Sequence, residues 1–221
     1  DNLVALAKHS IKTKAQEIKQ KLEGSNIVFL LGNITNELSA LNAIEIAKIA
    51  RDTGGLTIFI GSYPFSFEGS ETRKSAEANK LLLQQELDGV IVIDHEKTFA
   101  KDVPAAEVLT LVDKMIASWV NELIELVERV GVVNVDFNDF KTTISRAGDL
   151  FFSVAEGKVD QIPALLDKLF SGTSSQTNAY DKLQRALYVI SGRPNISVET
   201  TEVIGKGIAS RLHSEARIIF G

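Results

Sequence analysis

The sequence predicts an α/β protein with an open, mostly parallel sheet, a long central helix and a smaller α/β domain at the carboxyl end. Three observations predict this fold. Short apolar runs alternate with helical patterns in the first half of the chain, one helical pattern is unusually long, and further strand-like runs follow it. Such alternation is typical of βαβ units with right-handed crossovers.

The first half of the chain is expected to supply buried strands and the helices between them. Each strand is a short apolar run bounded by turn residues, which indicates a strand covered on both faces. In the turn after the first strand, Thr35 or Asn36 is expected to cap a helix, with Glu37 in its first turn. The strands are expected at Asn26–Gly32, Leu56–Gly61 and Gly89–Asp94, and the helices at Leu3–Leu22, Asn36–Asp52 and Glu71–Leu87.

The second half begins with a single long helical pattern from Val103 to Val130, in which apolar residues recur every three or four positions. This length favours a central helix between two domains. We therefore expect a first domain over 1–102, the central helix over 103–130 and a second domain over 131–221. In the second domain, strands are expected at Asp149–Ala155, Leu183–Ile190 and Ala216–Phe220, and helices at Gln161–Leu169 and Val198–His213.

Composition limits the classes of partner and compartment. The 221 residues carry 24 Lys and Arg against 29 Asp and Glu, a net charge of −5, so no cationic surface and no nucleic-acid partner are expected. The absence of cysteine excludes disulfides and Cys-based metal sites, and a cytoplasmic protein is predicted. No apolar run approaches the roughly 20 residues that cross a bilayer, so no direct membrane insertion is expected.

Two segments are candidate sites. The turn Leu31–Ser39 follows a predicted strand, but it has one glycine, and Glu37 would repel a phosphate, so it fails as a phosphate cradle. The loop Asn134–Asp139 carries two carboxylates, Asp136 and Asp139, which could orient a water and assist its deprotonation. In the alternative interpretation, Asn138 or Asp139 simply caps a short helix that begins at Phe140.

Other chemistry-bearing residues have simpler interpretations. No His or acidic cluster has the spacing of metal ligands, so no metal site is predicted. The histidines are expected at the surface or half-buried, and the aromatic residues are assigned to the core rather than to a cofactor. The histidines are His9, His95 and His213, and the aromatic residues are Trp119, Phe65, Phe67, Phe151 and Phe152.

Four segments, in order along the chain, resemble the cell-division protein FtsZ. The loop GVVNVDFNDFKT at Gly131–Thr142 resembles the synergy loop of that family, which is usually written close to GLINVDFADVKT. The other three segments are PFSFEG at Pro64–Gly69, VISGRPNISV at Val189–Val198 and ARIIFG at Ala216–Gly221, similar to PFxFEG, NITGGPDLTL and ANIIFG. The chain is therefore identified as a divergent member of the FtsZ/tubulin superfamily.

This resemblance implies a GTPase-type domain whose nucleotide lies between two subunits. It implies that Asp136 and Asp139, assisted by Asn134, activate water at a partner's nucleotide. It further implies that Glu68 contacts a ribose and Asp113 a guanine.

The chain also departs from the family pattern at several positions. The family's GGGTGTG phosphate loop falls on Thr35–Leu41, which keeps none of its glycines. Thr72 stands where an Arg is usual, with Arg73 adjacent; Leu109 replaces an aromatic residue, and His95 replaces an Asn. Nothing in the sequence corresponds to the family's first strands.

The favoured hypothesis is an FtsZ-like cytoskeletal or cell-division protein with a degenerate phosphate loop. It would bind GTP poorly or not at all by itself, associate longitudinally with itself or with a competent FtsZ-like protein, and offer its acidic loop to GTP held mainly by that partner. One alternative is a segment of an active polymerising GTPase whose amino-terminal elements are missing. Another is a non-filament scaffold that retains the fold.

Overall fold

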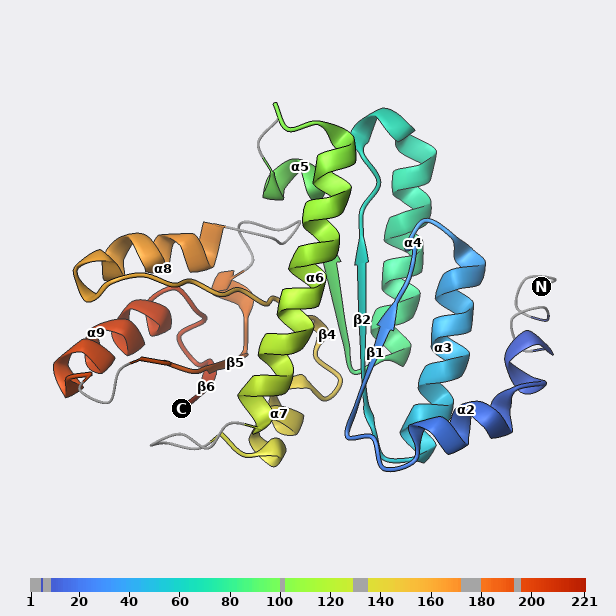
Figure 1. Ribbon diagram of the computed structural model, residues 1–221, viewed down its shortest axis with the longest axis horizontal. Helices are drawn as coiled ribbons and strands as arrows, with labels where there is room; N and C mark the ends of the chain where they lie inside the picture. Colours follow the sequence, from blue (N-terminus) through green and yellow to red (C-terminus); the bar gives the residue numbers. More distant parts are fainter. Residues whose placement is uncertain (1–4, 6–8, 100–101, 129–134, 172–179, 193–195) are drawn as a thin grey trace. The chain divides into compact units, whose positions relative to one another are not determined.

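The computed structural model describes residues 5, 9–99, 102–128, 135–171, 180–192 and 196–221 (Figure 1). The chain divides into two compact units. Unit 1 comprises Asp1–Ile116 and Ile144–Phe151, and unit 2 comprises Ala117–Thr143 and Phe152–Gly221. Each unit is described by itself.

Unit 1 is built on a parallel sheet. Its strands are β1 (Ile27–Leu31), β2 (Leu56–Ser62), β3 (Gly89–Ile93) and β4 (Gly148–Asp149), and they lie in the order β1-β2-β3-β4. The register pairs Phe29 with Ile58 and Ile60 with Ile91. All residues of β3 are buried, which agrees with strands covered on both faces. The predicted strands and their parallel arrangement are confirmed.

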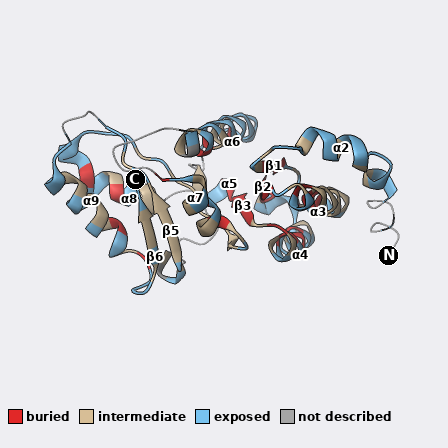
Figure 2. Ribbon diagram, turned by 90° about the horizontal axis from the view of Figure 1, so that it is seen from below, coloured by how far each residue is buried: buried red, intermediate tan, exposed pale blue. Residues whose placement is uncertain are grey.

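Helices connect the strands and cover one face of this sheet. These are α3 (Glu37–Asp52) and α4 (Ser70–Glu86), which run side by side, whereas α2 (Ala15–Leu22) precedes β1 and contacts α3 (Figure 1). Small alanines on α3 let it approach the strands closely, and the buried residues lie on the faces of α3 and α4 that meet the sheet (Figure 2). The core consists of Val28, Leu30, Ile34, Ala40, Ala43, Ile44, Ala47, Ala50, Phe59, Tyr63, Ala76, Leu83, Leu87, Val90 and Val92.

Two expected elements of unit 1 differ from the structure. The single helix expected over Leu3–Leu22 is interrupted, because Thr13 and Lys14 form a turn before α2 and the Thr13 hydroxyl donates to the Ser10 carbonyl. The strand expected over Asp149–Ala155 is reduced to β4. Only Gly148 and Asp149 pair with β3, and the chain enters unit 2 at Phe152.

The long helix α6 (Ala105–Glu128) confirms the predicted central helix, and the boundary between the units falls inside it. It is preceded by the short helix α5 (His95–Thr98). Among the described residues, no helix is both long and apolar enough to cross a membrane.

Unit 2 contains a small sheet and the helices that pack on it. Strands β5 (Arg185–Tyr188) and β6 (Arg217–Phe220) are parallel, and the helices that pack on them are α8 (Ile162–Ser171) and α9 (Val198–Ala209). Helix α7 (Phe137–Ile144) begins in this unit and ends at its boundary with unit 1. Its core is formed by Ile162, Leu166, Ile208 and Leu212, with Ala186, Tyr188 and Ile218 packed against them. A smaller α/β domain at the carboxyl end is therefore confirmed.

Candidate functional site

Parallel strands bring their carboxyl ends to one edge of a sheet, and open α/β sheets bind ligands there. In unit 1 this edge consists of residues 32–36 after β1, 63–69 after β2 and 94–96 after β3, and we call it the carboxyl edge. The side chains on these three segments decide which ligand the edge accepts.

The turn after β1 is held by its own side chains. Asn33 Oδ1 accepts hydrogen bonds from the Thr35 backbone N–H at 2.9 Å and from the Thr35 hydroxyl at 2.7 Å. Asn36 caps α3, because its Oδ1 accepts the Ser39 N–H at 3.1 Å. Glu37 follows in the first turn of the helix. The expected capped helix start is therefore confirmed, with Asn36 as the cap.

The single glycine of this turn is required by packing. A Cβ atom on Gly32 would lie 2.8 Å from Ser39 Oγ and 3.1 Å from the Phe59 ring. This close approach explains the glycine without a ligand.

A hollow of about 430 Å³ lies beside β1, which is the edge strand of the sheet. Leu31 at its rim is 62% exposed. Asn42 Oδ1 is buried and has no hydrogen-bond partner among the described residues. The hollow is lined by Phe29, Leu30, Leu31, Gly32, Asn36, Leu38, Ser39, Asn42, Ala43, Ile46 and Phe59.

The loop after β2 carries Glu68, for which the resemblance implies a ribose contact. Its Oε1 accepts the Phe65 N–H at 2.8 Å, so the carboxylate closes the loop on itself. The Phe65 and Phe67 rings are stacked with centroids 5.0 Å apart. Phe67 is 76% exposed, so its assignment to the core is wrong. A stacking partner on one face lets this ring remain at the surface.

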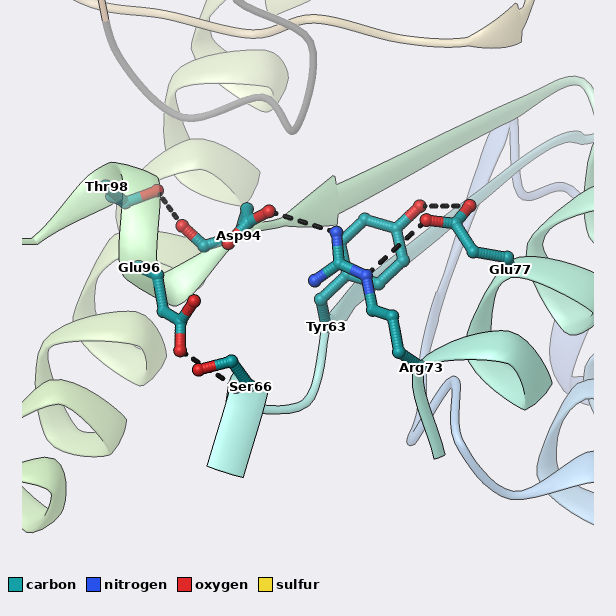
Figure 3. Close-up of polar contacts among 7 residues, drawn as sticks. All are labelled: Tyr63, Ser66, Arg73, Glu77, Asp94, Glu96 and Thr98. Carbon is teal, nitrogen blue, oxygen red and sulfur yellow. Dashed lines mark hydrogen bonds and ion pairs between the residues drawn. The ribbon is translucent and has the colours of Figure 1, made fainter. Parts of the chain in front are cut away.

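The segment after β3 supplies a buried charge that the sequence analysis did not single out. Asp94 is buried, and its Oδ2 lies 3.1 Å from Arg73 Nη2 on α4. Glu96 Oε1 accepts the Ser66 N–H at 2.8 Å (Figure 3). The signal was present in the sequence, since Asp-His-Glu directly follows a strand whose residues are all apolar or glycine.

His95 is buried, so the prediction that it lies at the surface or half-buried is wrong. Its ring lies against Phe65 with centroids 4.6 Å apart, and neither ring nitrogen has a hydrogen-bond partner among the described residues. Burial lowers the pKa of His95, and the nearby carboxylates of Asp94, Glu68 and Glu96 oppose that shift. The imidazole is therefore neutral at pH 7.

Asp113, for which the resemblance implies a guanine contact, lies on the part of α6 that belongs to unit 1 and is exposed. Its neighbour one turn earlier, Leu109, is 51% exposed. In the part of the chain that the structure describes, Asp113 makes no hydrogen bond or ion pair that would join it to Glu68 or His95.

The acidic loop lies in unit 2, at the start of α7. Asp136 is exposed, and its Oδ1 accepts the Asp139 N–H at 2.7 Å, which is the geometry of a helix cap. The helix begins at Phe137, so the alternative interpretation is right about a cap but wrong about the residue and about a start at Phe140. Phe140 and Ile144 are buried and lie four residues apart on one face of this helix. Asn134 lies outside the described residues.

Among the described residues, no group of three or more His, Cys, Asp and Glu side chains is placed to hold a metal ion.

Known proteins resemble this chain along nearly its whole length. It is 30% identical over 209 residues to "Cell division protein FtsZ 1" of Halobacterium salinarum, covering 93% of this chain and 52% of the relative. It is 27% identical over 232 residues to the FtsZ 1 of Archaeoglobus fulgidus, covering all of this chain and 60% of the relative. The fold matches the empty FtsZ dimer of M. jannaschii with a TM-score of 0.78 at 25% identity, covering 97% of this chain and 63% of that one. The chain belongs to the FtsZ/tubulin superfamily.

This superfamily member spans about half to three fifths of the curated FtsZ proteins that it matches. The sequence matches no family model. The same fold occurs in CetZ2 of Haloferax volcanii, solved as a GTPγS-bound protofilament, with a TM-score of 0.77 at 20% identity, covering 98% of this chain and 67% of that one. The family is one of cytoskeletal and cell-division proteins, and this chain is an FtsZ-like member of it.

Proposed function

We propose that this chain is an FtsZ-like subunit that binds GTP poorly or not at all at its own carboxyl edge. It associates longitudinally with itself or with a competent FtsZ-like protein. In that complex it offers Asp136 and Asp139, with Asn134, to the nucleotide held by the partner, where the carboxylates orient the attacking water.

The turn after β1 carries this proposal. A helix start binds phosphate through free backbone N–H groups and through its positive dipole. Here the N–H groups of Thr35 and Ser39 already donate to Asn33 and Asn36, and Glu37 adds a carboxylate to the first turn. The residues of this turn also carry side chains in the space that a glycine-rich loop would leave open for phosphate. The residues present therefore do not fit a triphosphate.

The acidic loop supports the second half of the proposal. Asp136 and Asp139 lie at the start of a helix whose Phe140 and Ile144 are buried, so the carboxylates are held on a rigid element. Asp136 is exposed and Asp139 half-buried, so both are accessible from outside the unit. The CetZ2 relative was solved as a protofilament, which supports subunit-to-subunit association as the setting for this loop.

Calorimetric titration of GTP into the isolated chain tests the first half, and we expect no heat of binding at micromolar GTP. Tight binding would refute it. Sedimentation with and without GTP, alone and mixed with a GTP-hydrolysing FtsZ from the same cell, tests the association. The mixture is expected to co-sediment and to hydrolyse GTP at a rate that falls when Asp136 and Asp139 are replaced by Asn.

A second candidate function has its own supporting observation. The chain covers 63% of the M. jannaschii FtsZ chain, and β1 is an edge strand beside a hollow of about 430 Å³. Both features favour a segment of an active polymerising GTPase whose further elements complete the pocket. Intact mass spectrometry of the native protein separates the two candidates, since a mass well above 24.1 kDa supports the segment and a mass of 24.1 kDa excludes it.

A further inference from the structure

A guanidinium group, which is the side-chain group best suited to bind phosphate, lies beside the carboxyl edge. Arg73, on the first half of α4, is 37% exposed at its side chain, so it is within reach of solvent. A phosphate-bearing ligand at this edge would be expected to pair with it. The contacts of Arg73 therefore decide whether such a ligand can bind.

Two carboxylates and one aromatic ring already hold this guanidinium (Figure 3). Arg73 Nη2 lies 3.1 Å from Asp94 Oδ2, and Arg73 Nε lies 3.5 Å from Glu77 Oε1. The guanidinium carbon lies 3.8 Å from the centroid of the Tyr63 ring, which places a cation over an aromatic face.

The groups around Arg73 are themselves fixed. The Tyr63 hydroxyl donates to Glu77 Oε2 at 2.9 Å, and Tyr63 is only 1% exposed. The side chain of Asp94 is 5% exposed, and its backbone carbonyl accepts the Thr98 hydroxyl at 2.7 Å. The network therefore joins the ends of β2 and β3 to α4, and its members on the strand side, Tyr63 and Asp94, are buried.

A fixed internal carboxylate has two advantages over a phosphate from solution. It is already desolvated and positioned, so it loses no translational or rotational freedom on pairing. Its charge, with that of Glu77, also leaves the surroundings of Arg73 negative, and Glu68 and Glu96 lie on the same edge. An incoming polyanion would have to displace Asp94 and meet this negative potential.

We propose that Asp94 is a specificity-determining residue that occupies Arg73 as an internal anion and thereby excludes phosphate from the carboxyl edge. This inference rests on the proposed function, which it deepens by naming the side chains that reject the nucleotide in addition to the turn after β1. The ion pairs of Arg73 with Asp94 and Glu77 occupy the guanidinium whether or not a nucleotide is present.

Thermal unfolding with and without pyrophosphate tests the proposal in the full chain. Asp94→Asn lowers the melting temperature and frees the guanidinium, so pyrophosphate at about ten times its Kd raises that temperature again by about 3 to 6 °C. The wild-type protein shows no such rise at the same concentration. Glu77→Gln is a milder variant, because the carboxylate that it changes is 49% exposed. Pyrophosphate is expected to raise its melting temperature as well.

Asp149→Asn is the matched control. It breaks a second ion pair of unit 1, in which Asp149 Oδ1 lies 2.8 Å from Lys80 Nζ. The Lys80 side chain is only 7% exposed, so pyrophosphate cannot reach it and does not restore the melting temperature. In the double variant Arg73→Gln/Asp94→Asn the response to pyrophosphate disappears.

Three results would overturn the proposal: protection of the wild type by pyrophosphate, no response of Asp94→Asn, or an equal response of Asp149→Asn. A lack of response in Asp94→Asn leaves the proposed function intact, because that function is tested by GTP titration of the wild type and by the acidic loop. Tight GTP binding by the wild type refutes the proposed function whatever the Asp94 variant does.

Discussion

Substitutions at Asp136 separate the two roles that its carboxylate can have. As a helix cap, Asp136 Oδ1 accepts the Asp139 N–H at 2.7 Å. As a catalytic group, it would act on a water at a partner's nucleotide. Alanine removes both roles, whereas asparagine keeps an oxygen that can accept the capping hydrogen bond and removes the negative charge.

The structure sets the expected magnitudes. Losing the cap in Asp136→Ala costs about 1 kcal/mol, or roughly 2–4 °C in melting temperature for a chain of this size. Asp136→Asn loses only the attraction of a charge to the helix dipole, which is about 0.3 kcal/mol at an exposed position. Urea denaturation should therefore place Asp136→Asn close to the wild type and Asp136→Ala clearly below it.

The hydrolysis assay should not distinguish the two variants. Mixed with a GTP-hydrolysing FtsZ, both variants should fail to stimulate hydrolysis if the carboxylate acts on water. An Asp136→Asn variant that stimulates hydrolysis as well as the wild type would refute the chemical role. An Asp136→Ala variant with an unchanged urea midpoint would refute the cap.

Three further predictions concern unit 1. Because burial holds the pKa of His95 below its ordinary value of 6.5, the unfolded chain binds a proton that the folded chain does not. Stability is therefore retained above about pH 6.5 and falls as the pH drops below it, and His95→Gln should flatten the dependence of the urea midpoint on pH. Gly61→Ala places a Cβ atom 2.9 Å from the Gly32 carbonyl oxygen and should cost about 1–3 kcal/mol in urea denaturation; an unchanged midpoint would contradict this contact. Asp149→Asn leaves Lys80 buried without its partner and should cost about 3 kcal/mol, while Lys80→Met/Asp149→Leu should recover much of that loss in the same assay.

The strands and the first helix start could be predicted because they depend on local sequence. A parallel strand covered on both faces is mostly apolar, which identifies Leu56–Gly61 and Gly89–Asp94 without any knowledge of the fold. The cap at Asn36 likewise depends on residues within one helical turn. The cap of α7 could not be predicted in this way, because Asp136, Asn138 and Asp139 are all good caps and only the hydrogen bond from the Asp139 N–H to Asp136 Oδ1 identifies the one that is used.

The network around Arg73 could not be predicted in this way, because it depends on tertiary register. Tyr63, Arg73 and Asp94 lie far apart in the chain, and they meet because the Tyr63 N–H donates to the Ile93 carbonyl at 2.8 Å. That hydrogen bond extends the parallel pairing of β2 and β3 by one residue. The burial of His95 has the same origin, since its cover is Phe65 from the loop after β2.

Asp139 is a better probe of chemistry than Asp136. The cap uses the Asp136 carboxylate, so its presence is explained by stability alone. The cap uses only the backbone N–H of Asp139, and its carbonyl accepts the Thr143 hydroxyl at 2.9 Å, so the described contacts do not require its carboxylate. Asp139→Asn should therefore leave the urea midpoint within about 0.3 kcal/mol of the wild type, because only a dipole interaction is lost. Loss of stimulated GTP hydrolysis in this variant would have no structural explanation in unit 2 and would support a chemical role of the carboxylate. Full retention of stimulated hydrolysis would mean that the acidic loop serves only as a helix start.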